Sequence, residues 1–345
     1  MRILGVETSC DDTAAAVVDD TGLVWSSVIS SQQSFHTKYQ GIVPEIASRR
    51  HTATVIATID EALLLAHMRI HDIDGIAVTY GPGLVGSLLI GVETAKALSY
   101  ASGRRLIPVN HLEGHIMASF LRDVDMTENQ LKESDLPLLA LIVSGGHTEL
   151  VYVDQWLHYR VLGATRDDAA GETLDKFAKY LGLGYPGGPA LQRIGRTGDS
   201  AYHTFPRVTF SKTGYEFSFS GLKTAGINYV KSLEEGELEN HLADVVASFE
   251  AAVVNELVGK SLRAARELHP KALAVVGGVA ANERLRTGFR KATNVRAYFP
   301  PMKYCTDNAA MIAYAGVRRS MAGICASLDL DVRSSLTIEE SSLDT

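Results

Sequence analysis

The first hundred residues alternate between apolar runs typical of buried strands and spaced apolar positions typical of helices. Runs over residues 3–6, 14–18 and 76–79 predict strands. Apolar side chains three or four residues apart predict two helices, which carry Val55, Ile59, Leu63 and Ala66, and Leu88, Val92 and Ala95. Strand, turn and helix in this order indicate an α/β fold.

The second half of the chain begins with the same pattern as the first. LPLLALIVSGGHTELVYVD aligns with MRILGVETSCDDTAAAVVD at a constant offset that pairs Ser144 with Ser9 and Thr148 with Thr13. Each segment predicts a hairpin whose polar turn offers backbone N–H groups and hydroxyls to an anion. We interpret the pair as an internal duplication, which suggests a ligand held in the cleft between two lobes.

The length of 345 residues also favours two lobes, because one core rarely grows this large. The polar stretch DVDMTENQLKESD marks the boundary between them. We therefore predict a first lobe over residues 1–123, a linker over 124–135 and a second lobe over 136–325, with its last helix packed back on the first lobe. Residues 326–345 are expected to form a flexible tail.

Composition restricts the class of protein. A hydrophobic fraction of 46% with 21% charged residues is typical of a globular chain. The net charge of -7 repels nucleic acid at long range, so an RNA partner must find a local basic patch. Cys10, Cys305 and Cys325 form no C-x-x-C, which argues against a disulfide framework. No apolar run approaches the ~18–20 residues of a membrane span, so we expect a cytoplasmic protein.

A histidine pair is the first candidate for chemistry. His111 and His115 are four residues apart, so on a helix their side chains share one face and a metal. Asp307 is a candidate third ligand, with the N-cap of a following helix as the alternative. The pair is not a metalloprotease H-E-x-x-H motif, since Leu112 occupies the glutamate position and Glu113 points elsewhere.

Several turns are candidates for binding a ligand. The double glycine at 277–278 lets a ligand approach the backbone, with a plain strand-to-helix turn as the alternative, and Asn282 suits an N-cap equally well. Asp11 in the first hairpin turn can position a nucleophile or only form the turn. Asp175, one turn into a predicted helix, is available for ligand hydroxyls.

The ordered motifs together resemble one family, the TsaD family of tRNA N6-adenosine threonylcarbamoyltransferases, formerly described as O-sialoglycoprotein endopeptidases. The resemblance covers residues 1–325. It rests on ETSCDDT (7–13), GPGLVGSL (81–88), NHLEGH (110–115), VSGGHTEL (143–150), DDAAGETLDK (167–176), YPGGP (185–189), FSFSGLKT (217–224), GGVAAN (277–282) and YCTDNAAMI (304–312).

The resemblance implies a fold of the actin, Hsp70 and sugar-kinase type and two kinds of site. It implies a metal, Fe²⁺ or sometimes Zn²⁺, held by His111, His115 and Asp307, and a catalytic role for Asp11. It also implies that an adenine nucleotide or threonylcarbamoyl-AMP is bound by Ile142, Val143, Ser144, Gly145, Gly146, Asp175, Gly188 and Asn282.

The implied reaction transfers threonylcarbamoyl from threonylcarbamoyl-AMP to N6 of the adenosine 3′ of the anticodon, in tRNAs that read codons beginning with A. The implied partners are tRNA and TsaB-like and TsaE-like companion proteins. The alternatives are an ATP-dependent small-metabolite kinase of the same fold, a metalloprotease and a non-enzymatic nucleotide-gated scaffold.

Overall fold

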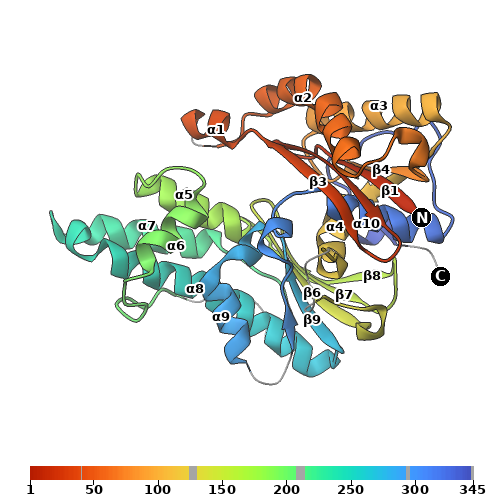
Figure 1. Cartoon of the computed structure of the whole chain (residues 1–345). Coiled ribbons are helices and arrows are strands. Elements are labelled where there is room, and N and C mark those ends of the chain that lie inside the picture. The colour runs from red at the N-terminus through yellow and green to blue at the C-terminus, as the bar shows by residue number, and fades with distance from the viewer. Residues whose placement is uncertain (40, 124–129, 207–213, 293–295, 343–345) are drawn as a thin grey trace. The chain divides into compact units, whose positions relative to one another are not determined.

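The computed structural model describes residues 1–39, 41–123, 130–206, 214–292 and 296–342, which form two compact units (Figure 1). Unit 1 contains Met1–Asp135, Val153–Arg160 and Pro300–Thr345, and unit 2 contains Leu136–Tyr152 and Val161–Phe299. Residues 136–325 thus do not group as one lobe, because the chain from Pro300 onward belongs to unit 1. Residues 124–129 of the predicted linker lie outside the described residues.

Unit 1 is built on a five-stranded sheet of order β3-β2-β1-β4-β5. Its strands are β1 (Arg2–Glu7), β2 (Asp12–Asp19), β3 (Val24–Ser31), β4 (Gly75–Gly81) and β5 (Arg105–Asn110). Its helices are α1 (Gln33–His36), α2 (Pro44–Leu65), α3 (Val85–Ser102), α4 (His111–Met117) and α10 (Ala309–Met321). The strands β1–β3 are antiparallel, and β4 and β5 run parallel to β1.

Helices cover both faces of this sheet (Figure 1). Leu4 and Val6 of β1 share a buried cluster with Val55 and Ile59 of α2. Side chains alternate along a strand, so Gly5 points to the opposite face, where a Cβ atom would collide with the backbone of α10. Glycine is therefore required here for the close approach of α10.

The second sheet repeats the order of the first, as β10-β9-β6-β7-β8. Its strands are β6 (Leu138–Val143), β7 (Thr148–Val153), β8 (Tyr159–Ala164), β9 (Ala272–Val276) and β10 (Ala297–Tyr298). In both sheets the hairpin strands lie on one side of the first strand and the parallel strands on the other. The predicted duplicated α/β fold is confirmed.

The helices of unit 2 follow its hairpin and its parallel strands. They are α5 (Ala170–Tyr180), α6 (Gly187–Gly195), α7 (Ser220–Ser232), α8 (Glu237–Leu268) and α9 (Glu283–Lys291). No helix within the described ranges is both long and apolar enough to cross a bilayer.

The C-terminal residues 326–342 differ from the flexible tail that the sequence suggested. The backbone N–H of Arg333 donates to the carbonyl of Tyr80 (2.8 Å), and Leu336 and Ile338 are buried. Two separated apolar side chains are enough to hold this segment, although they produce no regular pattern. The tail therefore forms part of unit 1.

Candidate metal centre and nucleotide loops

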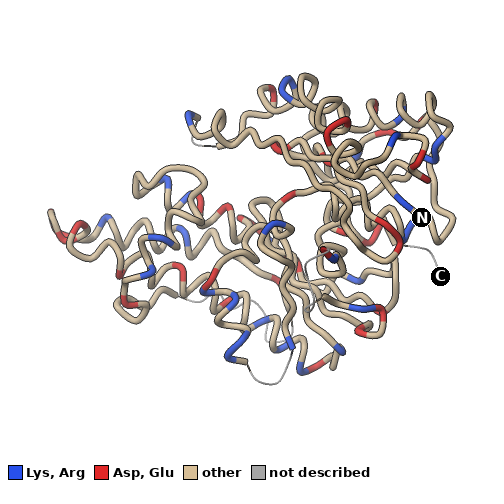
Figure 2. The backbone as a smooth tube through the Cα atoms, in the orientation of Figure 1, with Lys and Arg blue, Asp and Glu red and all other residues tan. Residues whose placement is uncertain are grey.

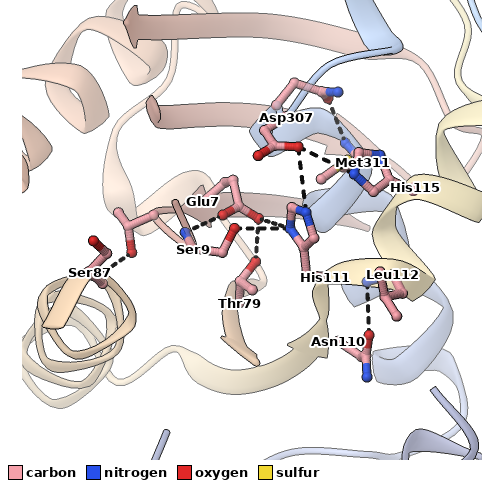
Figure 3. Close-up of polar contacts among 12 residues, drawn as sticks. Glu7, Ser9, Thr79, Ser87, Asn110, His111, Leu112, His115, Asp307 and Met311 are labelled. Atoms are coloured by element: carbon pink, nitrogen blue, oxygen red, sulfur yellow. Dashed lines mark hydrogen bonds and ion pairs between the residues drawn. The ribbon is translucent and has the colours of Figure 1, made fainter. Parts of the chain in front are cut away.

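Three potential metal ligands meet within unit 1 (Figure 3). His111 Nε2 lies 3.5 Å and His115 Nε2 3.3 Å from Asp307 Oδ1. One donor atom from each residue lies within 4.8 Å of the others. Donors that sit about 2.0–2.2 Å from a common ion are separated by such distances. The predicted triad is thus assembled in the folded chain.

The local sequence explains how the two histidines come to share a face. Asn110 caps α4, because its Oδ1 accepts a hydrogen bond from the N–H of Leu112 (2.8 Å). His111 is then the first helical residue, and His115 follows one turn later. At Gly114 a side chain would meet Ile312 of α10, so glycine also allows the two helices to approach.

Asp307 comes from the segment that leads into α10. The N-cap of this helix is Asn308, whose Oδ1 accepts from the N–H of Met311 (3.0 Å). The capping alternative for Asp307 is therefore wrong. Because its neighbour caps the helix, the Asp307 carboxylate faces the two imidazoles instead (Figure 3).

Glu7 supports the site from behind. Its Oε2 lies 3.0 Å from His111 Nδ1 and accepts from the Thr79 hydroxyl (2.7 Å), and its Oε1 accepts from the N–H of Ser9 (2.5 Å). A carboxylate on one imidazole nitrogen fixes the ring and leaves the other nitrogen for a ligand. The sequence suggested only a turn acid at Glu7, since nothing local pairs it with a residue of another strand's end.

The residues present fit a divalent metal. His115 is 1% exposed, and neither of its ring nitrogens has a hydrogen-bond partner within the described part of the chain. Leaving such a buried polar atom without a partner costs about 1–3 kcal/mol. Two imidazoles and one carboxylate are a donor set suited to Fe²⁺ or Zn²⁺. A bound cation would give the orphaned nitrogen its partner.

Charges in the cluster are strongly interdependent. Burial alone would lower the pKa of His111, but the carboxylates of Glu7 and Asp307 hold this pKa well above its ordinary value. Burial would raise the pKa of Asp307, yet the two histidines hold it well below its usual range. Burial lowers the pKa of His115, which favours the neutral ring that a metal requires.

Asp11 and Asp12 lie at the turn between β1 and β2, also in unit 1. Burial, and then the charge of Asp307, raise the pKa of Asp11 above its ordinary value. Burial raises the pKa of Asp12 to about 6, although a hydrogen bond from Ser31 opposes this. Both carboxyls are thus stronger bases than a solvated aspartate.

The raised pKa of Asp12 predicts a stabilising substitution. The folded pKa of about 6 exceeds the ordinary value of 3.8, so ionising Asp12 reduces the free energy of unfolding as the pH rises between these values. Asp12→Asn should stabilise the protein by up to ~3 kcal/mol at pH 8 and much less at pH 5. Urea denaturation of both proteins at each pH measures this, and equal differences at both pH values would contradict it.

The predicted phosphate turn lies between β6 and β7 in unit 2. The N–H of Ser144 donates to the carbonyl of His147 (2.9 Å), and the N–H of His147 donates to the Ser144 hydroxyl (3.1 Å). The glycines at 145 and 146 are exposed, and a Cβ atom at either would meet nothing within 4 Å. The Ile142 and Val143 side chains are fully buried, so only their backbone is available to a ligand.

Asp175 on α5 is only partly available. Its Oδ1 accepts from the N–H groups of Gly187 (2.7 Å) and Gly188 (3.1 Å) at the start of α6. A Cβ atom at Gly188 would again meet open space. Burial raises the pKa of Asp175 above its ordinary value. Asp175 therefore shapes the turn as well as offering its second oxygen.

Asn282 is the N-cap of α9, and it has a second partner that the sequence did not predict. Its Oδ1 accepts from the N–H of Leu285 (2.9 Å), and its Nδ2 donates to Glu250 Oε1 (2.6 Å). Glu250 is 2% exposed and also accepts from Arg284 Nε (3.0 Å). A lone glutamate in the apolar stretch SFEAAVV of α8 was the available signal.

The predicted site residues thus divide between the two units. Asp11 and the three potential metal ligands lie in unit 1, and the proposed nucleotide residues lie in unit 2. Within each unit, the structure brings together residues that are distant in sequence, namely His111 with Asp307 and Asp175 with Gly188.

Solved structures share this fold at low sequence identity. Component A of (R)-2-hydroxyglutaryl-CoA dehydratase from Acidaminococcus fermentans has a TM-score of 0.51 at 16% identity, covering 93% of this chain and 99% of that chain. T. kodakarensis HypF has a TM-score of 0.61 at 15% identity, covering 93% and 48%. These similarities support the duplicated two-sheet fold of the actin, Hsp70 and sugar-kinase type.

Sequence relatives are much closer. The chain is 49% identical over 330 residues to a tRNA N6-adenosine threonylcarbamoyltransferase of Caldicellulosiruptor bescii, covering 95% of each. It is 45% identical over 341 residues to one of Kosmotoga olearia, covering 98% and 99%. Residues 24–314 match the family described as TsaD, tRNA N6-adenosine threonylcarbamoyltransferase. The chain therefore belongs to the TsaD family.

Proposed function

We propose that this protein modifies tRNA by transferring a threonylcarbamoyl group to N6 of an adenosine, the activity for which its relatives are named. The observation that carries the proposal is the triad of His111, His115 and Asp307, with Glu7 behind it, in a chain of this family. The donor is threonylcarbamoyl-AMP, and the acceptor is the adenosine 3′ of the anticodon in tRNAs that read codons beginning with A.

In this reaction the N6 amine of adenosine attacks the carbamoyl carbon of the donor. A nitrogen–carbon bond forms, the bond from this carbon to the phosphate oxygen breaks, AMP leaves, and the amine loses a proton. An adenine amine is a weak nucleophile, so groups that stabilise charge on the carbonyl and phosphate matter most. An anticodon-loop base is already unpaired, which reduces the cost of presenting it.

His111, His115 and Asp307 would hold the metal, for which we propose Fe²⁺ with Zn²⁺ as the alternative. A divalent metal bound there supplies Lewis-acid polarisation and orients oxygen atoms of the donor. Glu7 keeps the His111 ring oriented, with a proton held at Nδ1. Asp11 is the proposed proton acceptor, because its raised pKa makes it a better base than a solvated aspartate.

The nucleotide part of the donor is proposed to bind unit 2. The turn at Ser144, Gly145 and Gly146 would contact phosphate, and the second oxygen of Asp175, the backbone at Gly188 and the Asn282 amide would contact the nucleoside. The open space beside the glycines supports this assignment, since a ligand can reach the backbone there.

Gly145→Val should weaken binding of adenine nucleotide by at least tenfold. The added side chain occupies the space through which phosphate would approach, yet it contacts no protein atom, so the fold should be preserved. Isothermal calorimetry with AMP measures the effect. Gly259→Val on α8 is the matched control, since its Cβ also meets open space. Unchanged affinity in Gly145→Val would place the nucleotide elsewhere.

The rival functions fit the chain less well. A small-metabolite kinase has no need of the two-histidine site, and the relatives are named as transferases. A protease would need Glu113 as its base, but Glu113 is 0% exposed and paired with Arg319. A nucleotide-gated scaffold would tolerate loss of Asp11, which the substitution discussed below tests.

We propose that companion proteins resembling TsaB and TsaE assist tRNA recognition in the cytoplasm. Lys and Arg are interspersed with Asp and Glu along the backbone (Figure 2), and the net charge is -7. Of the basic pairs in the sequence, Arg319 is buried and Arg318 lies over Trp156 (4.0 Å to the ring), so neither offers a free phosphate contact. The isolated chain is therefore poorly equipped for a polyanion.

The protein alone should bind tRNA weakly at physiological salt, and the companions should increase both affinity and multiple-turnover modification. Filter binding with tRNA and a turnover assay, each with and without the companions, measure the difference. Equal affinity and equal turnover in both samples would refute the argument from charge.

A further inference from the structure

Glu113 forms a buried ion pair in the middle of the metal-bearing helix. It lies between His111 and His115 on α4 and is 0% exposed. Its Oε2 accepts from Arg319 Nε (2.7 Å) and lies 2.6 Å from Arg319 Nη2. Arg319 belongs to α10, the helix that Asp307 precedes. The pair therefore ties together the two elements that supply all three ligands.

The C-terminal segment 333–342 completes this connection. Arg319 Nη2 also donates to the carbonyl of Ser341 (2.9 Å). At the other end of α4, Asn110 Nδ2 donates to the carbonyl of Thr337 (3.0 Å). The side chain of Ile338, between these two carbonyls in sequence, is 0% exposed. The segment thus contacts the start of α4 directly and its middle through Arg319.

The same segment is anchored to the ends of neighbouring elements. The N–H of Arg333 donates to the Tyr80 carbonyl (2.8 Å), and the N–H of Gly83 donates to the Ser334 carbonyl (3.1 Å). Its position is therefore fixed before it reaches α4.

Helix α4 needs such external support. It has only seven residues, and a helix this short is unstable on its own. A displacement or rotation of α4 would move both histidines relative to Asp307. Groups outside the ligand shell that hold ligands in place commonly change metal affinity by about 10–100-fold.

We propose that residues 333–342, through Asn110 and the Glu113–Arg319 pair, position the histidine ligands and so set the affinity of the metal site. Asn110, Glu113 and Arg319 are positioning residues, since none is a proposed ligand. The inference rests on the metal assignment in the proposed function, but it assigns a new role to the C-terminal segment.

The test is Co²⁺ binding to the metal-free full-length protein and to two shortened chains. A chain ending at Leu336 lacks the Thr337 and Ser341 carbonyls, whereas a chain ending at Ser342 keeps both. We expect the shorter chain to bind Co²⁺ at least tenfold more weakly, with an altered visible absorption spectrum, and the longer one to match the full-length protein. Equal affinity and spectrum in all three would overturn the proposal.

Two point variants keep the proposal testable if the shorter chain does not fold. Asn110→Ser keeps an N-cap oxygen but loses the donor to Thr337, and Arg319→Lys keeps the charge but loses the two-pronged contact. Each should weaken Co²⁺ binding about three- to tenfold while its thermal unfolding stays cooperative, and unchanged affinity in both would overturn the proposal. If the full-length protein bound no Co²⁺, the metal assignment itself would fail, which distinguishes the two cases.

Discussion

Replacing His115 with alanine is expected to abolish metal binding and to reduce threonylcarbamoyl transfer by about 10³-fold or more, because metal catalysis supplies several kcal/mol to such reactions. The fold should survive. Neither ring nitrogen of His115 has a hydrogen-bond partner among the residues that the structure describes, so its removal leaves no protein group unpaired. Metal analysis by mass spectrometry and a transfer assay measure the two effects.

His111→Ala should give the same loss of metal and activity, but with a cost in stability. Glu7 is 1% exposed and pairs with His111 Nδ1, so this substitution leaves a buried carboxylate without its partner. Exposed His71 is the control, since His71→Ala should change none of these properties. Full metal occupancy in His115→Ala would contradict the assignment of the site.

Asp11→Asn should lower the rate of transfer by about 10²–10⁴-fold while leaving metal bound, because it removes the proposed general base. In the unchanged protein the rate should fall on acidification at a pH above the ordinary aspartate value of 3.8, since the pKa of Asp11 is raised. Burial is the larger cause of this shift, so its direction holds even when the charge of Asp307 is compensated. The pH profile of kcat/KM measures the effect, and the acidic limb should disappear in the variant.

Asp12→Asn is the matched control for this experiment. It removes the neighbouring carboxylate of the same turn and should keep most of the activity. If Asp11→Asn kept full activity at every pH, Asp11 would have no role in proton transfer, and a non-enzymatic role for the chain would regain ground.

Much of the fold could be predicted from the sequence, because its strands and helices have regular apolar patterns. The match between the two hairpins led directly to the repeated sheet order. The assignment of the C-terminal region was less successful. Leu336 and Ile338 are buried by contacts with residues far away in the sequence, and such contacts leave no periodic signal.

The metal ligands could be proposed because two of them are one helical turn apart and the third lies in a family motif. The residues that support them could not. Glu7 and Arg319 reach the site from β1 and α10, and their importance depends on which elements become neighbours. Glu250 is comparable in unit 2, since only the fold shows that it holds Asn282.

The most direct test of the central claim is mass spectrometry of nucleosides from tRNA incubated with the metal-loaded protein, its companions and threonylcarbamoyl-AMP. We predict that one adenosine, 3′ of the anticodon, gains a threonylcarbamoyl group, and that His115→Ala in the same mixture gives none. Unmodified adenosine with the metal-loaded protein, or equal modification with His115→Ala, would contradict the account.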